Sequence, residues 1–200
     1  MVKKITALIL CAVLVCAGFS SCSSVNTDMT EENITKTVDK AFDALKSFDT
    51  KNLDKYVKSS TLSMIISYAE KHSQFQKLGA SLFNDLSYEI TNIDIENATV
   101  TLDVQNKDLT EAASDFASEL KNKYSTIQLL AKLSDEKFLD SNLSALNDDI
   151  ANASMSDGKT TITLSIEKGS KNLVLSFDAD AENAVSGGAL SAIKSIYALG

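Results

Sequence analysis

Apolar residues recur at helical spacing in the first half of the chain. Residues 30–48 carry one apolar stripe behind a capping threonine and two acidic residues, which predicts a helix. Polar residues 49–52 end it, residues 53–57 suggest a short helical turn, and a second long helix is expected over residues 61–84. The apolar phase of this second helix slips near His72, which predicts a bend or burial on more than one face.

The pattern changes to strict alternation after residue 86, which is typical of strands. Two alternating runs within residues 86–104 flank a two-residue turn at residues 96–97 and predict a β-hairpin. The alternation shifts phase at residues 91–92, where one extra residue in a β-bulge accounts for the slip. The bulge keeps four apolar side chains on one sheet face: Tyr88, Ile90, Ile93 and Ile95.

Helical spacing returns over residues 108–131, where Asp108 and Glu111 predict a capping box. A further helix, capped by Ser134 or Asp135, is expected to follow. Its surplus of polar residues indicates that this second helix is the less buried of the two.

A second hairpin is predicted over residues 160–177. With a turn at Gly169–Ser170, Ile166 pairs with Leu173, and apolar residues occupy one face while polar residues occupy the other. A final helix over residues 189–199 can pack beneath this sheet. The same register gives two more apolar pairs: Leu164 with Leu175, and Ile162 with Phe177.

This order of elements predicts one α+β domain over residues 30–200. The expected architecture is an antiparallel sheet of two hairpins, packed on one face by several helices. A chain of this length suits a single domain with a substantial buried core.

The first 22 residues have a different pattern. Two lysines precede an uncharged apolar run over residues 5–19, and small residues then lead to Cys22. Residues 1–21 with Cys22 resemble a bacterial lipoprotein signal peptide and its lipobox. The resemblance implies cleavage after Ser21, diacylglycerol on the Cys22 thiol with further acyl chains such as palmitate, and a lipid-anchored location on the bacterial cell membrane, facing outside the cytoplasm.

Two other interpretations of this segment are weaker. Cys16 is a competing acylation site, but the branched Val15 precedes it where signal cleavage needs a small residue. An uncleaved membrane helix is disfavoured because the 15-residue run reaches about 22 Å, short of the ~30 Å hydrocarbon core. Residues 22–29 are expected to form a lipidated tether.

The charge of the chain limits its binding partners, and its cysteine content limits the disulfides that it can form. Without the two lysines of the signal, 17 lysines face 27 acidic residues, a formal charge of −10. The overall field therefore repels nucleic acid and anionic lipid head groups. The mature chain keeps one of the three cysteines, Cys22, and so forms no internal disulfide.

The domain also resembles bacterial lipoproteins with NTF2-like, or cystatin-like, domains. The likeness rests on the lipobox, the helix over residues 30–48 and the bulged hairpin with its strand at residues 97–102. It implies a helix-packed sheet around a conical pocket, in which similar enzymes sometimes use His or Asp.

His72 is the only histidine, so any serine or cysteine triad would have to include it. It can act as a lone general base, but its neighbours Lys71 and Ser73 favour a helix-surface or partly packed position. Four aspartates cannot be ranked as catalytic acids before their burial is known: Asp43, Asp54, Asp85 and Asp103.

No cofactor or metal site is predicted. Asp178, Asp180 and Glu182 alternate like the ligands of a calcium loop, but Asn183 occupies that motif's glycine position. These acids are interpreted as a solvated strand end and a helix cap. The Gly158-Lys159-Thr160 triplet is interpreted as a turn, because the upstream glycine of a phosphate loop is missing.

The sequence favours a membrane-anchored extracytoplasmic lipoprotein that binds a protein or small molecule without catalysis. Its expected partners are the lipid bilayer, through acyl chains on Cys22, and that unidentified ligand, but no nucleic acid. Two alternatives stay open: an NTF2-like enzyme using a single buried Asp or His72, and an envelope structural or assembly factor. An isolated carboxylate or His72 at the floor of a deep cavity would favour the enzyme, and an exposed apolar patch would favour protein partners.

Overall fold

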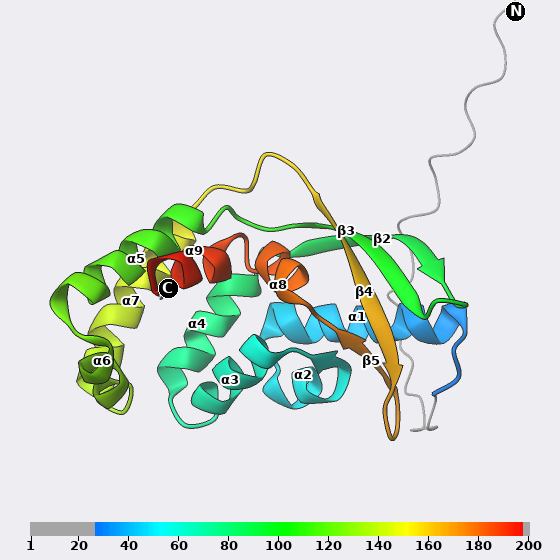
Figure 1. The fold of residues 1–200 in the computed structure, drawn as a ribbon, viewed down its shortest axis with the longest axis horizontal. Coiled ribbons are helices and arrows are strands. Elements are labelled where there is room, and N and C mark those ends of the chain that lie inside the picture. The colour runs from blue at the N-terminus through cyan, green and yellow to red at the C-terminus, as the bar shows by residue number, and fades with distance from the viewer. Residues whose placement is uncertain (1–26, 198–200) are drawn as a thin grey trace, which may run out of the picture.

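The computed structural model describes residues 27–197. The predicted signal peptide, Cys22 and the first part of the tether lie outside these residues, as does the end of the predicted last helix. The described chain combines helices with a five-stranded sheet, which confirms the α+β class (Figure 1).

The first helix forms as its pattern predicts. Helix α1 (Glu31–Ser47) begins behind the capping Thr30 and ends at Phe48, whose backbone is left-handed with φ of 47°. Helix α2 (Thr50–Tyr56) follows directly. Val57, expected in a helical turn, instead begins strand β1 (Val57–Lys58), because its backbone pairs with a distant strand.

Two helices replace the single helix predicted over residues 61–84. They are α3 (Ser60–Ala69) and α4 (Ser73–Phe83), and His72 is the N-cap of α4. The predicted bend near His72 is therefore confirmed as a complete break. A Cβ on Gly79 would collide with the ring of Phe48, so this glycine lets α4 lie close to the end of α1.

The first hairpin has the predicted bulge. Strands β2 (Ser87–Asp94) and β3 (Thr99–Gln105) pair antiparallel, with the register shift at Thr91. The turn has four residues and not the predicted two, because the carboxylate of Asp94 accepts the backbone N–H of Asn97 (2.9 Å) and starts the turn early.

Three helices follow: α5 (Thr110–Lys123), α6 (Thr126–Lys132) and α7 (Glu136–Asn152). The prediction of one helix over residues 108–131 is wrong, because Ser125 and Gln128 form a capping box that starts α6 as a separate helix.

The capping box predicted at Asp108 is also wrong. Helix α5 begins at Thr110, and its N-cap is Leu109, which offers no side-chain hydrogen bond. Asp108 lies just before the helix, and its carboxylate accepts the backbone N–H of Thr110 (3.0 Å). The α7 cap is Asp135, one of the two candidates.

The second hairpin has the predicted faces but a different register. In strands β4 (Thr160–Lys168) and β5 (Leu173–Ser176), Ile166 pairs with Leu175, so the predicted pairing with Leu173 is wrong by two residues. Residues 169–172 form a four-residue loop closed by a backbone hydrogen bond of 2.9 Å between its ends. A shift of two residues preserves which side chains face the core.

The last two helices are α8 (Ala179–Val185) and α9 (Ala189–Tyr197). Helix α9 packs mainly against α5, so the expectation that it lies beneath the sheet is wrong. The strand order is β1-β5-β4-β3-β2, and β1 runs parallel to β5. The sheet is therefore mixed, and not purely antiparallel as predicted.

Two hydrophobic clusters hold these elements together. The larger joins α1 to the apolar sheet face, and Ile34, Val38 and Phe42 are fully buried in it. The smaller centres on Phe138 and Leu139 in α7 and receives side chains from α4, α5 and α6. The helices α5 to α7 thus extend the fold beyond the end of the sheet (Figure 1).

Candidate functional site

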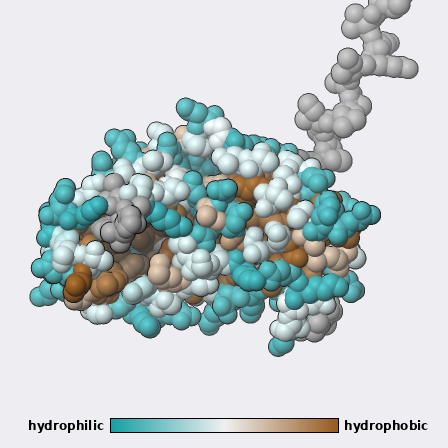
Figure 2. Space-filling view, in the orientation of Figure 1, coloured by the Kyte–Doolittle hydropathy of each residue, from teal (hydrophilic) through white to brown (hydrophobic). Residues whose placement is uncertain are grey.

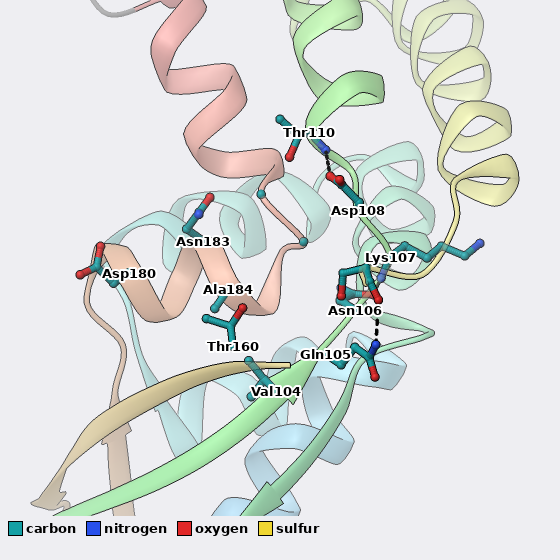
Figure 3. Close-up of a pocket in the computed structure, with 13 residues that line it drawn as sticks. Val104, Gln105, Asn106, Lys107, Asp108, Thr110, Thr160, Asp180, Asn183 and Ala184 are labelled. Carbon is teal, nitrogen blue, oxygen red and sulfur yellow. Dashed lines mark hydrogen bonds between the residues drawn. The ribbon is translucent and has the colours of Figure 1, made fainter. Parts of the chain in front are cut away.

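A polar groove lies where β3 ends, β4 begins and α8 turns into α9. Its cavity volume is about 390 Å³, and we call it the β3–α8 groove (Figure 3). Both hairpins contribute to it, since Gln105 ends β3 and Thr160 begins β4. Helix α8 contributes Asp180, Asn183 and Ala184, whose spacing of three and four residues places them on one helical face.

Asn106 fixes the floor of the groove. Its side chain is 3% exposed, and its amide nitrogen donates to the carbonyls of Leu82 (2.9 Å) and Val185 (2.8 Å). Its amide oxygen accepts the backbone N–H of Lys107 (2.8 Å). One buried side chain therefore ties the ends of α4 and α8 to the end of β3, and such satisfied networks are rigid.

The lysine that follows is directed out of the groove. The Lys107 ammonium donates to the carbonyls of Ile150 (3.1 Å) and Ala151 (2.9 Å) near the end of α7 and lies 3.3 Å from the Asp85 carboxylate. Figure 3 shows this side chain pointing away from Asn183. Its charge stabilises the C-terminal end of α7. Within residues 27–197, neither Asp108 nor Asp180 has an ion-pair partner.

Two glycines allow the α8–α9 turn to reach the wall of the groove. Gly187 and Gly188 have φ of 59° and 84°, a conformation that other residues adopt only with strain. The carbonyl of Gly187 accepts the N–H of Leu109 (2.8 Å), and a Cβ on Gly187 would collide with the carbonyl of Lys107. Any other residue at position 187 would therefore be strained.

Several groups of the groove remain available to a ligand. The carboxylate of Asp180 and the hydroxyl of Thr160 make no hydrogen bond within the described chain. Asn183 uses its amide oxygen to accept the N–H of Ser191 (3.1 Å), which leaves its NH₂ donors open. The groove therefore presents acceptors and donors on a fixed backbone, an arrangement suited to hydroxyl or amino groups.

Glu182 forms a closed polar cluster on the other side of α8. One carboxylate oxygen accepts the Ser59 hydroxyl (2.5 Å) and the Thr61 N–H (3.2 Å), and the other accepts the Thr61 hydroxyl (2.6 Å). Lys194 lies 3.7 Å away. Burial alone raises the pKa of Glu182, but the hydrogen bonds from Ser59 and Thr61, with the Lys194 charge, hold that pKa below its ordinary value.

The interpretation of Glu182 as a solvated acid is wrong, because the side chain is 3% exposed. The sequence carried no signal for this, since Ser59 and Thr61 lie far away along the chain. Asp178 does cap α8, accepting the N–H of Ala181 (2.9 Å), which confirms the predicted helix cap.

His72 lies away from the groove, at the break between α3 and α4. Its side chain is 15% exposed, so His72 is partly packed at the bend, which is one of the two positions expected for it, and does not lie on the open helix surface. The Nδ1 atom is buried without a hydrogen-bond partner and lies 3.8 Å from a carboxylate oxygen of Glu136. The ring also approaches Phe75, which accounts for part of its burial.

The four aspartates left unranked by the sequence are not buried. Asp43, Asp54 and Asp85 are exposed, and Asp103 is half-buried on the polar sheet face, where it accepts the Thr161 hydroxyl (2.6 Å). Within residues 27–197, Glu182 is the one acidic side chain that is buried.

The described residues contain no group of three or more His, Cys, Asp or Glu side chains placed to hold a metal ion. Across the same residues, no helix has the length and apolar character needed to cross a membrane.

Comparison of the chain with protein-family models, with curated proteins and with solved structures gives no significant match.

Proposed function

We propose that this protein is a bacterial lipoprotein, anchored by acyl chains on Cys22 outside the cytoplasm, whose α+β domain binds a polar ligand in the β3–α8 groove without transforming it. The anchor is supported by the charged, apolar and small-residue segments that precede Cys22. The binding role is supported by the groove itself.

One observation carries the binding role: the open polar groups of the groove stand on a backbone that buried hydrogen bonds hold in place. Asn106 fixes the floor through three bonds, and Gly187 fixes the wall through its carbonyl. Groups that need no rearrangement on binding keep more of their interaction energy as affinity. Asp180, Asn183 and Thr160 are therefore the side chains expected to contact the ligand.

The charge of the groove indicates the class of ligand. Asp108 and Asp180 both line it, whereas the Lys107 ammonium is bound at the end of α7. Carboxylates repel anions and accept hydrogen bonds from hydroxyl and ammonium groups. We therefore expect a neutral or cationic ligand rich in hydroxyl or amino groups.

The finer fold assignment is also a proposal. We infer that the domain is a variant of the NTF2-like, or cystatin-like, fold, and the bulged β2–β3 hairpin packed against a long N-terminal helix supports this. The helices α5 to α7 and the final helix depart from the common form of such domains, and the parallel strand β1 departs from the antiparallel sheet that the sequence predicts.

Specific observations favour the two alternatives. The buried, unpaired Nδ1 of His72 beside Glu136 favours an enzyme that uses this histidine as a base. The exposed side chains of Ile127 (80%) and Leu130 (61%) on α6 favour an assembly factor, and Figure 2 shows apolar surface over this helix.

A ligand screen tests the binding role. The mature chain carrying Cys22→Ala would be screened by thermal shift against sugars, amino sugars, polyamines and short peptides. The proposal expects a hit that stabilises this protein and loses its effect in Asn183→Leu. Thr163→Val, which alters an exposed threonine on the polar sheet face, is the matched control and should keep the hit. A hit that responds only to His72→Gln, with turnover, would establish the enzyme instead.

A further inference from the structure

The end of the domain that leads toward Cys22 also carries both hairpin connections. Thr99, the first residue of β3, pairs with Ser165 in β4, so the β2–β3 turn and the β4–β5 loop extend from the same end of the sheet. Figure 1 shows the start of α1 at this end and α5 to α7 at the opposite end. We call the start of α1, the β2–β3 turn and the β4–β5 loop the turn end.

The β4–β5 loop projects from the turn end and is locally cationic. Strand β4 continues past Ser165 to Lys168 before the loop begins. Lys168 and Lys171 are exposed, and neither ammonium has an ion-pair partner among the described residues. No acidic residue occurs between Glu167 and Asp178, so nothing in the loop itself neutralises the two lysines.

The loop is held in a fixed position. The side-chain amide of Asn172 donates to the carbonyl of Lys55 (2.7 Å) at the end of α2 and to that of Leu173 (2.8 Å). A backbone hydrogen bond from Gly169 to Asn172 (2.9 Å) closes the loop. The backbone that carries the two lysines is therefore fixed, so binding requires no ordering of the loop itself.

The chain between Cys22 and the domain limits where the membrane can be. Residues 27–29 already lie against the domain, because Met29 packs on the larger hydrophobic cluster and the Asp28 carbonyl accepts the side-chain amide of Asn33 (3.0 Å). The chain from residue 22 to residue 27 spans at most about 18 Å when fully extended. The groove lies at the other end of β3, which is about 20 Å long at the usual rise per residue. A lipid on Cys22 therefore limits the distance between the turn end and the head groups, and contact of the β4–β5 loop with the bilayer would place the groove farther out.

We propose that Lys168 and Lys171 contact the anionic phosphate groups of the lipid surface, so that the turn end faces the bilayer and the β3–α8 groove faces outward. This inference rests on the proposed acylation of Cys22. The formal charge of −10 and the exposed acids Glu31, Glu32 and Glu96 of the turn end itself oppose a broad contact, which confines the attraction to the projecting loop. Acidic side chains more than about 8 Å from the loop are largely screened at physiological salt.

Energy transfer in vesicles tests this orientation. The mature chain has no cysteine besides Cys22, so a single introduced cysteine accepts one dye. The acylated full chain would be reconstituted in phosphatidylcholine vesicles containing phosphatidylglycerol and an acceptor lipid, with the dye on Ser170→Cys or on Thr126→Cys at the start of α6. We expect strong transfer from residue 170 and weak transfer from residue 126. Equal transfer from the two sites would overturn the proposal.

Paired lysine variants test the contact itself. Lys168→Ser with Lys171→Ser should weaken the contact by on the order of tenfold and should lower transfer from residue 170 to its level in pure phosphatidylcholine. The control, Lys71→Ser with Lys137→Ser, makes the same charge change at exposed sites away from the turn end and should leave transfer unchanged. The contact is disproved if the loop variant behaves like the control.

Membrane fractionation separates this inference from the proposed function. If Cys22→Ala stays in the membrane fraction, the acyl anchor fails and the orientation argument fails with it. If Cys22→Ala is released but residues 170 and 126 give equal transfer in the acylated protein, the anchor stands and only the orientation is wrong.

Discussion

Glu182 and Asp180 stand two residues apart on α8, and their surroundings are opposite. Successive helical residues are about 100° apart, so these two side chains point to nearly opposite sides of the helix. Glu182 is 3% exposed, and both of its oxygens accept hydrogen bonds from Ser59 and Thr61 at the start of α3. Asp180 lines the β3–α8 groove and has no hydrogen-bond partner within the described chain. One carboxylate therefore holds the fold, and the other is available to a ligand.

Within one short helix, one side chain thus stabilises the fold and a different one is available for binding. A buried carboxylate is stable only when its oxygens are satisfied, and removing it leaves its partners unpaired. An open carboxylate keeps its water and contributes little to folding. Substitutions on the two faces of α8 should therefore have different effects.

The largest effect is expected from Glu182→Ala. The hydroxyls of Ser59 and Thr61 would lose a charged acceptor in a buried setting, so unfolding should become easier by about 3 kcal/mol. Urea denaturation of the mature chain measures this free energy. Asp180→Ala, on the same helix, is the control and should change it by no more than about 0.5 kcal/mol. Equal losses for the two variants would refute the proposed division of α8.

A somewhat smaller effect is expected from Asn106→Ala. The carbonyls of Leu82 and Val185 would both lose their donor, which should cost about 2 kcal/mol of unfolding free energy. Because these bonds hold the floor of the groove, ligand affinity should fall as well. Calorimetry and urea denaturation measure the two losses, and an affinity that is unchanged would show that the floor does not shape the site.

Gly187→Ala should cost about 1–2 kcal/mol, since alanine is strained at a φ of 59° and its Cβ meets the Lys107 carbonyl. Gly158→Ala is the matched control, because nothing lies within 4 Å of a Cβ there. Thermal unfolding distinguishes the two variants. A stable Gly187→Ala protein would mean that the turn can move away from β3.

The smallest effect is a pH dependence that comes from Glu182. Its pKa in the folded protein lies below the ordinary value of 4.5, so the unfolded chain binds this proton more readily. The stabilising contribution is therefore complete above about pH 4.5 and is lost as the pH falls through the lower folded pKa. The difference in unfolding free energy between the native protein and Glu182→Gln should shrink on acidification below that value. If this difference in unfolding free energy grows on acidification, the pKa of Glu182 is not lowered in the folded protein.

Local chemistry in the sequence predicted a good part of the fold. The α1 helix, the bulge at Thr91 and the break at His72 follow from side-chain periodicity, which reports on each element's own buried face. The faces of β4 and β5 were also predictable, because alternation survives a register shift of two residues.

Features fixed by tertiary contacts were not predictable. Loop lengths at residues 95–98 and 169–172 depend on hydrogen bonds within the folded turns, and β1 exists only because it meets β5. The burial of Glu182 requires partners from α3, distant in sequence. The candidate groove combines residues from β3, β4, α5 and α8, and no spacing in the chain marks them as neighbours.

The most direct test of the central claim is calorimetric titration of the screened ligand into the Cys22→Ala mature chain and into the same chain carrying Asp180→Ala and Asn183→Leu. Both residues stand on the groove face of α8, and Asp180 is exposed. The account predicts that the double variant keeps its unfolding free energy within about 1 kcal/mol and binds the ligand about tenfold more weakly or not at all. An unchanged dissociation constant in a folded double variant would contradict the assignment of the β3–α8 groove as the binding site.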